Sequence, residues 1–165
     1  MVVNYTGNVF DTGAHVICHQ VNCKGVMGGG IALTIKRKYP SVFSAYKAMC
    51  KKMTPESLLG KIQPCICGGA KEIWIINMFA QNEFGTDKRQ TDYEAFEACC
   101  RELREWAILN GHKKIAMPHG IGCGLAGGDW NVVLNILKKV FYNNKVDVEL
   151  WKMPTKQDAW RNRYD

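Results

Sequence analysis

The chain has 165 residues, of which 47% are hydrophobic and 22% are charged, and its formal net charge is +7. This composition excludes an intrinsically disordered chain, and the length is sufficient for one domain with a good core but short for two. The longest apolar runs, such as residues 73–76, are much shorter than a membrane span, so we expect no membrane-spanning segment.

In its first half, the sequence predicts strands and helices. Short β-branched runs bounded by glycine are typical of strands, and apolar residues at helical spacing are typical of helices. Pro40 ends the first expected helix, and Ser41 is the expected N-cap of the second. The Gly68-Gly69 pair predicts a tight turn within an antiparallel hairpin. In chain order, the expected elements are strands at 2–6 and 14–20, helices at about 30–38 and 42–52, and strands at 61–67 and 72–79.

The second half continues this alternation. Residues 91–94 form a capping box, Thr-Asp-Tyr-Glu, and the apolar spacing after it predicts a helix that ends at Gly111. A strand is expected at 113–118. A further helix follows with Asp129 as its N-cap, and a last strand covers about 146–152.

Strands that alternate with helices, with one hairpin among them, predict an α/β fold: a three-layer α/β/α domain with a central mixed sheet. We expect residues 1–152 to form this single domain and residues 153–165 to form a polar C-terminal tail. In such sheets, ligands bind outside the carboxyl ends of the strands. The loops that follow the strands are therefore the expected binding site.

Two glycine-rich loops, residues 21–32 and 118–130, each lie between an expected strand and an expected helix. Clustered glycines let the backbone take positive φ and approach a ligand without a Cβ in the way. A helix start offers free N–H groups and the positive end of the helix dipole, which suits phosphate. Together the loops predict a ligand with two phosphates, or a phosphate flanked by sugars, held from both sides.

The second loop also satisfies the dinucleotide-binding pattern G-x-G-x-x-G at residues 122–127, between a strand and a helix. Three features count against a Rossmann site. The motif lies near the C-terminus with one strand left, the sheet contains a hairpin, and the first glycine loop would have no role. A Rossmann site is therefore the less favoured alternative.

Cysteine and lysine patterns bear on cofactors and partners. The eight cysteines show no paired C-x-x-C spacing, so we expect reduced thiols, no metal site and no cofactor.

Residues 1–5 lack the features of a signal peptide, and we expect a cytoplasmic monomer. Basic clusters such as residues 36–38 suit a polyanion, which leaves nucleic acid as an alternative partner. We prefer the interpretation that these basic clusters are solvent-exposed faces of helices, because no aromatic residues are interleaved with the basic ones, as they are in many nucleic-acid-binding surfaces.

Four segments resemble the macrodomain family: residues 7–10 (Gly-Asn-Val-Phe), 19–23 (His-Gln-Val-Asn-Cys), 27–32 (Met-Gly-Gly-Gly-Ile-Ala) and 118–125 (Pro-His-Gly-Ile-Gly-Cys-Gly-Leu). The likeness spans residues 1 to about 152. It implies a cleft for ADP-ribose, with adenine near the first loop, the pyrophosphate between the two loops and the distal ribose near the asparagine. The residues that the resemblance assigns to the ligand are Asn8, Val9, Asn22, Gly28, Gly29, Gly30, Ile31, Gly120, Ile121, Gly122, Cys123, Gly124, Leu125 and Trp151.

Three of these residues match specific family positions, and each has a purely structural alternative. Asn8 stands where many macrodomains have an aspartate that accepts a hydrogen bond from the adenine amino group, or it is a turn residue. Asn22 matches an asparagine that binds the distal ribose, or it bonds to its own loop. Trp151 matches an aromatic residue that stacks on adenine in some members, or it is a core or surface aromatic.

The resemblance points to two subclasses with different chemistry. The second loop is most similar to a subclass that removes terminal ADP-ribose from glutamate or from nucleic-acid bases. Ala126 replaces the aspartate of that subclass, however, and its lysine is missing just after the strand that ends at residues 77–80. The first loop resembles a subclass that dephosphorylates ADP-ribose 1″-phosphate, in which a histidine stands at the position of His19.

The expected catalytic residues are His19, Asn22 and Asp129. A histidine of near-neutral pKa beside an anion site can activate water or protonate a leaving oxygen, whereas the alternative is a satisfied strand histidine. Asn22 would position the distal ribose. Asp129 would orient a water, or it only caps its helix. Cys123 lies near a helix start but is the weaker nucleophile candidate, because no partner base is identifiable.

Two functions are therefore carried forward. The first is a hydrolase that binds ADP-ribose derivatives and cleaves an ADP-ribosyl ester or adduct, or the 1″-phosphate. The alternative is a non-catalytic reader or sink for ADP-ribose-type, NAD-derived nucleotides. We favour the hydrolase because of His19.

Overall fold

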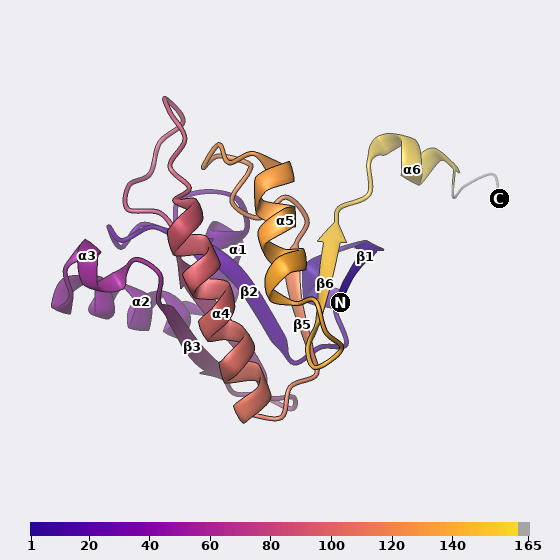
Figure 1. Cartoon of the computed structure of the whole chain (residues 1–165), viewed down its shortest axis with the longest axis horizontal. Helices are drawn as coiled ribbons and strands as arrows, with labels where there is room; N and C mark the ends of the chain where they lie inside the picture. The colour runs from indigo at the N-terminus through magenta and orange to yellow at the C-terminus, as the bar shows by residue number, and fades with distance from the viewer. Residues whose placement is uncertain (162–165) are drawn as a thin grey trace.

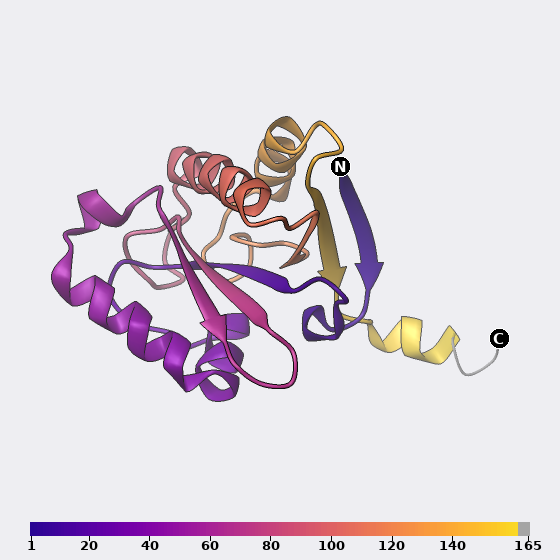
Figure 2. The ribbon, with the colours of Figure 1, turned by 90° about the horizontal axis from the view of Figure 1, so that it is seen from below.

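The computed structural model describes residues 1–161, and its centre is one mixed sheet (Figures 1 and 2). The strands are β1 (Val2–Thr6), β2 (Val16–Val21), β3 (Ile62–Cys67), β4 (Ile73–Phe79), β5 (Lys114–Pro118) and β6 (Asp147–Lys152). Their order across the sheet is β1-β6-β5-β2-β4-β3. Of these six strands, β3 alone runs antiparallel to its neighbour. The carboxyl ends of the other five therefore meet at one edge of the sheet.

Helices cover both faces of the sheet (Figure 2). One face carries η1 (Val9–Asp11), α1 (Gly30–Lys38), α2 (Pro40–Lys52) and the short α3 (Pro55–Leu58). The other carries α4 (Tyr93–Leu109) and α5 (Trp130–Val140). After β6, α6 (Lys156–Arg161) extends away from the sheet (Figure 1). Between residues 1 and 161, none of the helices is long and apolar enough to cross a membrane.

The core lies on both sides of β2, which explains the three layers. Cys18 packs in the cluster under α4 and α5, whereas Ile17 packs with Ile35 of α1 and Val42 of α2. Successive side chains of a strand point to opposite faces, so an apolar strand needs a cover on each side. α5 buries one apolar stripe, which continues into the residue that follows the helix: Val133, Ile136, Leu137, Val140 and Phe141.

Two helix starts differ from the prediction. α2 begins at Pro40 instead of being capped by Ser41, because the fixed φ and missing N–H of proline suit the first helical position. The N-cap of α4 is Asp92, not Thr91. The Asp92 carboxylate accepts a hydrogen bond from the Ala95 N–H at 3.0 Å.

Two connections also differ. The antiparallel hairpin of β3 and β4 is confirmed, but residues 68–72 separate the strands, so the connection is longer than a two-residue turn. The segment expected as a polar tail contains α6, and its last residues, 162–165, lie outside the described part of the chain.

Candidate functional site

A cavity of about 580 Å³ opens at the carboxyl edge of the sheet, beside the ends of β2, β4 and β5. Small-molecule sites typically span roughly 300–1,000 Å³. The first glycine loop, the segment after β4 and the second glycine loop form its three walls. The lining residues are Gln20, Val21, Asn22, Val26, Gly28, Gly29, Gly30, Ile31, Ala32, Gln81, Phe84, Gly85, Thr86, Pro118, His119, Gly120, Ile121, Gly122, Gly124, Leu125 and Ala126.

Asn22 organises the first wall. Its Oδ1 accepts hydrogen bonds from the Lys24 N–H at 2.9 Å and the Tyr46 hydroxyl at 2.7 Å. Its Nδ2 donates to the Val26 carbonyl at 2.8 Å. These bonds fold the loop around one amide group, as the structural alternative predicts, and Tyr46 ties the loop to α2. Asn22 lines the cavity, and its contact with a ribose stays a prediction.

Backbone amides supply many of the polar groups at the cavity. The first turn of a helix leaves its amides without a carbonyl partner, and in α1 these amides belong to Gly30, Ile31 and Ala32. The second loop adds five amides that make no hydrogen bond within residues 1–161, those of Gly120, Gly122, Gly124, Leu125 and Ala126. Both sets belong to cavity-lining residues. The site can therefore bind anionic oxygens from two sides.

The segment between β4 and α4 forms the third wall and links the two glycine loops. Thr91 is 2% exposed. Its hydroxyl donates to the Gly122 carbonyl at 2.6 Å and accepts from Gln20 Nε2 at 2.8 Å. At the other end of the segment, the Cys23 N–H donates to the Asn82 carbonyl at 3.0 Å. The segment thus fixes the positions of both loops.

Two cavity glycines could not carry a side chain without displacing a neighbour. A Cβ on Gly29 would lie 2.8 Å from Leu125 Cδ1, so the two glycine loops approach each other closely there. Gly122 has a φ of +75°, and a Cβ on it would lie 2.8 Å from Gln20 Oε1. Glycine at these positions lets the walls come together around a narrow ligand.

The structure places His19 away from the cavity. The side chain is fully buried, and its Nε2 lies 2.6 Å from Asn77 Oδ1. Asn77 Nδ2 donates in turn to Gln63 Oε1 at 3.0 Å. Burial lowers the pKa of His19 to about 4, although the bond to Asn77 raises it slightly. The expectation that His19 lies beside the anion site is therefore wrong, because the buried ring does not reach the cavity. The next residue, Gln20, lines the cavity instead.

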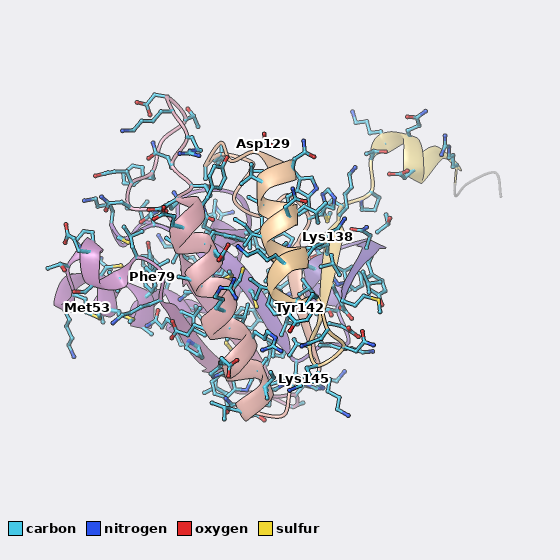
Figure 3. All side chains as sticks on the ribbon, in the orientation of Figure 1. Met53, Phe79, Asp129, Lys138, Tyr142 and Lys145 are labelled. Carbon is cyan, nitrogen blue, oxygen red and sulfur yellow. The ribbon has the colours of Figure 1, made fainter. Side chains whose placement is uncertain are left out.

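Asp129 and Cys123 also lie outside the cavity lining. Figure 3 shows Asp129 at the exposed start of α5, where its carboxylate accepts from the Asn131 N–H at 2.9 Å. The expected cap is therefore present. Burial, together with the charge of Asp129, raises the pKa of Cys123 to about 11, so its thiol is a poor nucleophile at neutral pH.

Three further residues expected to bind the ligand, Asn8, Val9 and Trp151, are not part of this cavity either. Asn8 caps η1 by accepting from the Phe10 N–H at 3.0 Å, and Val9 is buried. The Trp151 ring stacks on Tyr5 at a centroid distance of 4.9 Å, and its Nε1 donates to Glu149 Oε1 at 3.0 Å. Asn8 and Trp151 thus have the structural roles that were their alternatives, and their adenine contacts, like a ligand contact of Val9, stay predictions.

Sequence reasoning missed the third wall and one ionisable residue. Gln20, Gln81, Phe84, Thr86 and His119 line the cavity but were not expected to bind ligand. A signal for the third wall existed: a long polar segment with a glycine follows a strand of the sheet, and parallel strands end at the same edge. His119 lay inside the quoted second loop.

Residues 18–137 match the family model of the Macro domain. The match covers well over half of the sequence, so the chain belongs to the macrodomain family, which decides against the Rossmann alternative. The chain is 32% identical over 145 residues to the DNA ADP-ribosyl glycohydrolase of Mycobacterium tuberculosis. That alignment covers 86% of this chain but 39% of the relative, so the chain spans about two fifths of that protein's length.

Two further similar proteins match over nearly all of their length. The ADP-ribose 1″-phosphate phosphatase of Meyerozyma guilliermondii is 29% identical, and the alignment covers 83% of this chain and 93% of that protein. The solved macrodomain of Mycobacterium tuberculosis DarG is similar with a TM-score of 0.78 and 28% identity, over 94% of this chain and 99% of that one. The predicted fold class, a three-layer α/β/α macrodomain with a mixed sheet, is thus confirmed.

Proposed function

We propose that this macrodomain binds ADP-ribose in the cavity and hydrolyses an ADP-ribose derivative. The observation that carries the proposal is the pair of amide sets, at the start of α1 and in the second glycine loop, on the walls of one cavity. A diphosphate between two sugars has the charge and the length that such walls can hold. The names of the two curated relatives support hydrolysis, of a DNA adduct in one case and of the 1″-phosphate in the other.

A second candidate, a reader that binds without cleavage, is favoured by a specific observation. The described lining residues include no aspartate, glutamate, lysine or cysteine. Ala126 lies on the wall where the similar subclass has an aspartate. Acid–base chemistry at this site would depend on a histidine or on the substrate itself.

Calorimetry and product analysis test both candidates. We expect ADP-ribose to bind with a Kd on the order of micromolar, about 8 kcal/mol, and AMP to bind more weakly because it lacks the second phosphate and the distal ribose. Mass detection of ADP-ribose released from an ADP-ribosylated DNA oligonucleotide, an ADP-ribosylated protein and ADP-ribose 1″-phosphate identifies the cleaved linkage. Binding without any turnover would establish the reader, and no binding at millimolar ADP-ribose would refute both candidates.

Gly29→Glu tests whether the cavity holds the ligand. Its side chain would meet the exposed Leu125, which can turn away, while its carboxylate would occupy the space between the loops and repel the phosphates. We expect at least a hundredfold loss of ADP-ribose affinity with a nearly unchanged melting temperature. Gly13→Glu is the matched control, because Gly13 is exposed and a Cβ there has no atom within 4 Å.

Two points about the cellular setting stay proposals. We place the protein in the cytoplasm, because eight free thiols suit a reducing compartment. We also propose that it acts as a monomer, with the ADP-ribosylated molecule as its partner. Size-exclusion chromatography with light scattering would test the second point.

A further inference from the structure

His119 is the one ionisable side chain among the described residues that line the cavity. The remaining lining residues are glycines, apolar residues, amides and a threonine. A diphosphate ligand brings two negative charges, and the walls offer it amide dipoles but no lysine or arginine among their described residues. Any charge that the cavity wall gains on binding must therefore reside on His119.

The fold holds His119 firmly at this wall. It follows Pro118 at the end of β5, and its N–H donates to the Trp151 carbonyl at 2.8 Å. Its ring lies against Trp130, in the first turn of α5, with 4.6 Å between the ring centroids. The backbone hydrogen bond and the ring contact thus fix the imidazole at a defined place between the cavity and α5.

The groups packed around His119 disfavour the charged form of its imidazole in the free protein. Partial burial, and then the charge of Lys152 at the end of β6, lower the pKa of the imidazole below its usual value. On the α5 side, Trp130 is uncharged, and Asp129 accepts a hydrogen bond from the N–H of Asn131 in the cap. Within the second loop, the Cys123 thiol stays protonated because its pKa is raised.

We propose that His119 contacts the bound nucleotide and takes up a proton from the solvent when the diphosphate enters the cavity, so that ADP-ribose affinity depends on pH. The inference rests on the proposed function, because it requires that this cavity holds the diphosphate. A negative charge within a few ångströms favours the charged imidazole, so the pKa of His119 is higher in the complex than in the free protein.

The direction of the pH effect follows from that difference. Above the pKa of the complex, His119 is neutral with and without ligand, and affinity is independent of pH. As the pH falls through that pKa, binding takes up a proton and affinity rises, until it levels off below the pKa of the free protein. A rise of one pKa unit on binding corresponds to about a tenfold gain in affinity.

Calorimetry of ADP-ribose with the full chain tests this proposal. Titrations between pH 5.5 and 8.5 give the Kd, and at one pH near 6.5 two buffers with different ionisation enthalpies give the number of protons taken up. We expect proton uptake and a several-fold tighter Kd at pH 5.5 than at pH 8.5. His119→Gln should abolish both effects while ADP-ribose still binds.

His112→Gln is the matched control. The His112 ring also lies against a tryptophan, Trp106, with 5.2 Å between the ring centroids, and burial also lowers its pKa, but it lies outside the cavity. This variant should retain the proton uptake of the native protein. A native Kd that does not change with pH, or proton uptake that persists in His119→Gln, would overturn the proposal. No binding of ADP-ribose at any pH by the folded protein would instead overturn the proposed function itself.

Discussion

At the scale of single residues, His19 illustrates how burial decides the state of an ionisable group. The imidazole is fully buried in β2, and its Nδ1 has no hydrogen-bond partner within the described part of the chain. A proton on this ring would place a charge among apolar side chains with a single amide oxygen to balance it. The folded protein therefore keeps His19 neutral down to about pH 4, whereas in the unfolded chain the same ring becomes charged as the pH falls below about 6.5.

This difference predicts an acid-sensitive fold. The pKa of His19 is about 4 in the folded protein, whereas its ordinary value, which applies to the unfolded chain, is 6.5. As the pH falls, the unfolded chain therefore binds a proton at this residue before the folded protein does. The free energy of unfolding should fall as the pH drops from about 6.5 to 4, by about 3 kcal/mol from this residue. Urea unfolding of the native protein and of His19→Gln, which cannot titrate, isolates the effect. Equal pH dependence in the two proteins would contradict it.

At the scale of elements, the segment between β4 and α4 connects the parts of the site. The Thr91 hydroxyl accepts from Gln20 Nε2 and donates to the Gly122 carbonyl, which joins this segment to β2 and to the second glycine loop. Gln81 extends the network, because its Oε1 accepts from Gln20 Nε2 at 2.9 Å. Loops positioned in this way are preorganised for a ligand, which lowers the entropy cost of binding.

Thr91→Val should disrupt this connection. It removes one of the two hydrogen bonds that the Gly122 carbonyl accepts, since the Gly128 N–H still donates to it at 2.9 Å, and one of the two acceptors of Gln20 Nε2. We therefore expect a loss of about 1 kcal/mol in stability and weaker ADP-ribose binding. Thr91→Ser keeps the hydroxyl and should restore both. Urea unfolding and calorimetry provide the measurements.

Thr34→Val serves as the control for this change, because the Thr34 hydroxyl is exposed and reaches the Gly30 carbonyl of its own helix at 3.5 Å. Its effects should be small. Thr91→Val with native stability and affinity would show that the segment does not position the loops.

At the scale of the whole molecule, ligand binding and stability should be coupled. The cavity lies between segments that leave three different strands, so a ligand that contacts them together binds the folded chain and not the unfolded one. At a ligand concentration of a hundred times Kd, the fold gains about 2.7 kcal/mol. For a chain of this size, this gain corresponds to a rise of roughly 5–10 °C in the melting temperature.

Thermal unfolding with and without ADP-ribose measures this shift, and Gly29→Glu should lose it. In the same experiment a chelator should leave the melting temperature unchanged, because no group of three or more His, Cys, Asp or Glu side chains within residues 1–161 is placed to hold a metal. A reductant should also have no effect on the eight free cysteines. A drop of several degrees with chelator would reveal a ligand set that these residues do not show.

The sequence by itself determined the elements and the fold class, because those depend on local patterns. Apolar periodicity located the six strands and the four longer helices, α1, α2, α4 and α5, to within a few residues, whereas the short η1, α3 and α6 were not predicted. One hairpin made the sheet mixed. The glycine loops were also readable, since positive φ and an open helix start are properties of a short segment. Caps were less certain, because Thr91 and Asp92 both suit an N-cap and the wider network decides between them.

Only the tertiary structure decided which side chains reach the cavity. His19 and Gln20 are neighbours on β2, but their side chains point to opposite faces of the sheet. His19 is therefore buried, whereas Gln20, one residue further along, lines the cavity. The order β5-β2-β4 brings Phe84 and His119, from segments far apart in the chain, to one cavity. Strand order depends on contacts between distant segments, and a local sequence pattern carries no information about those contacts.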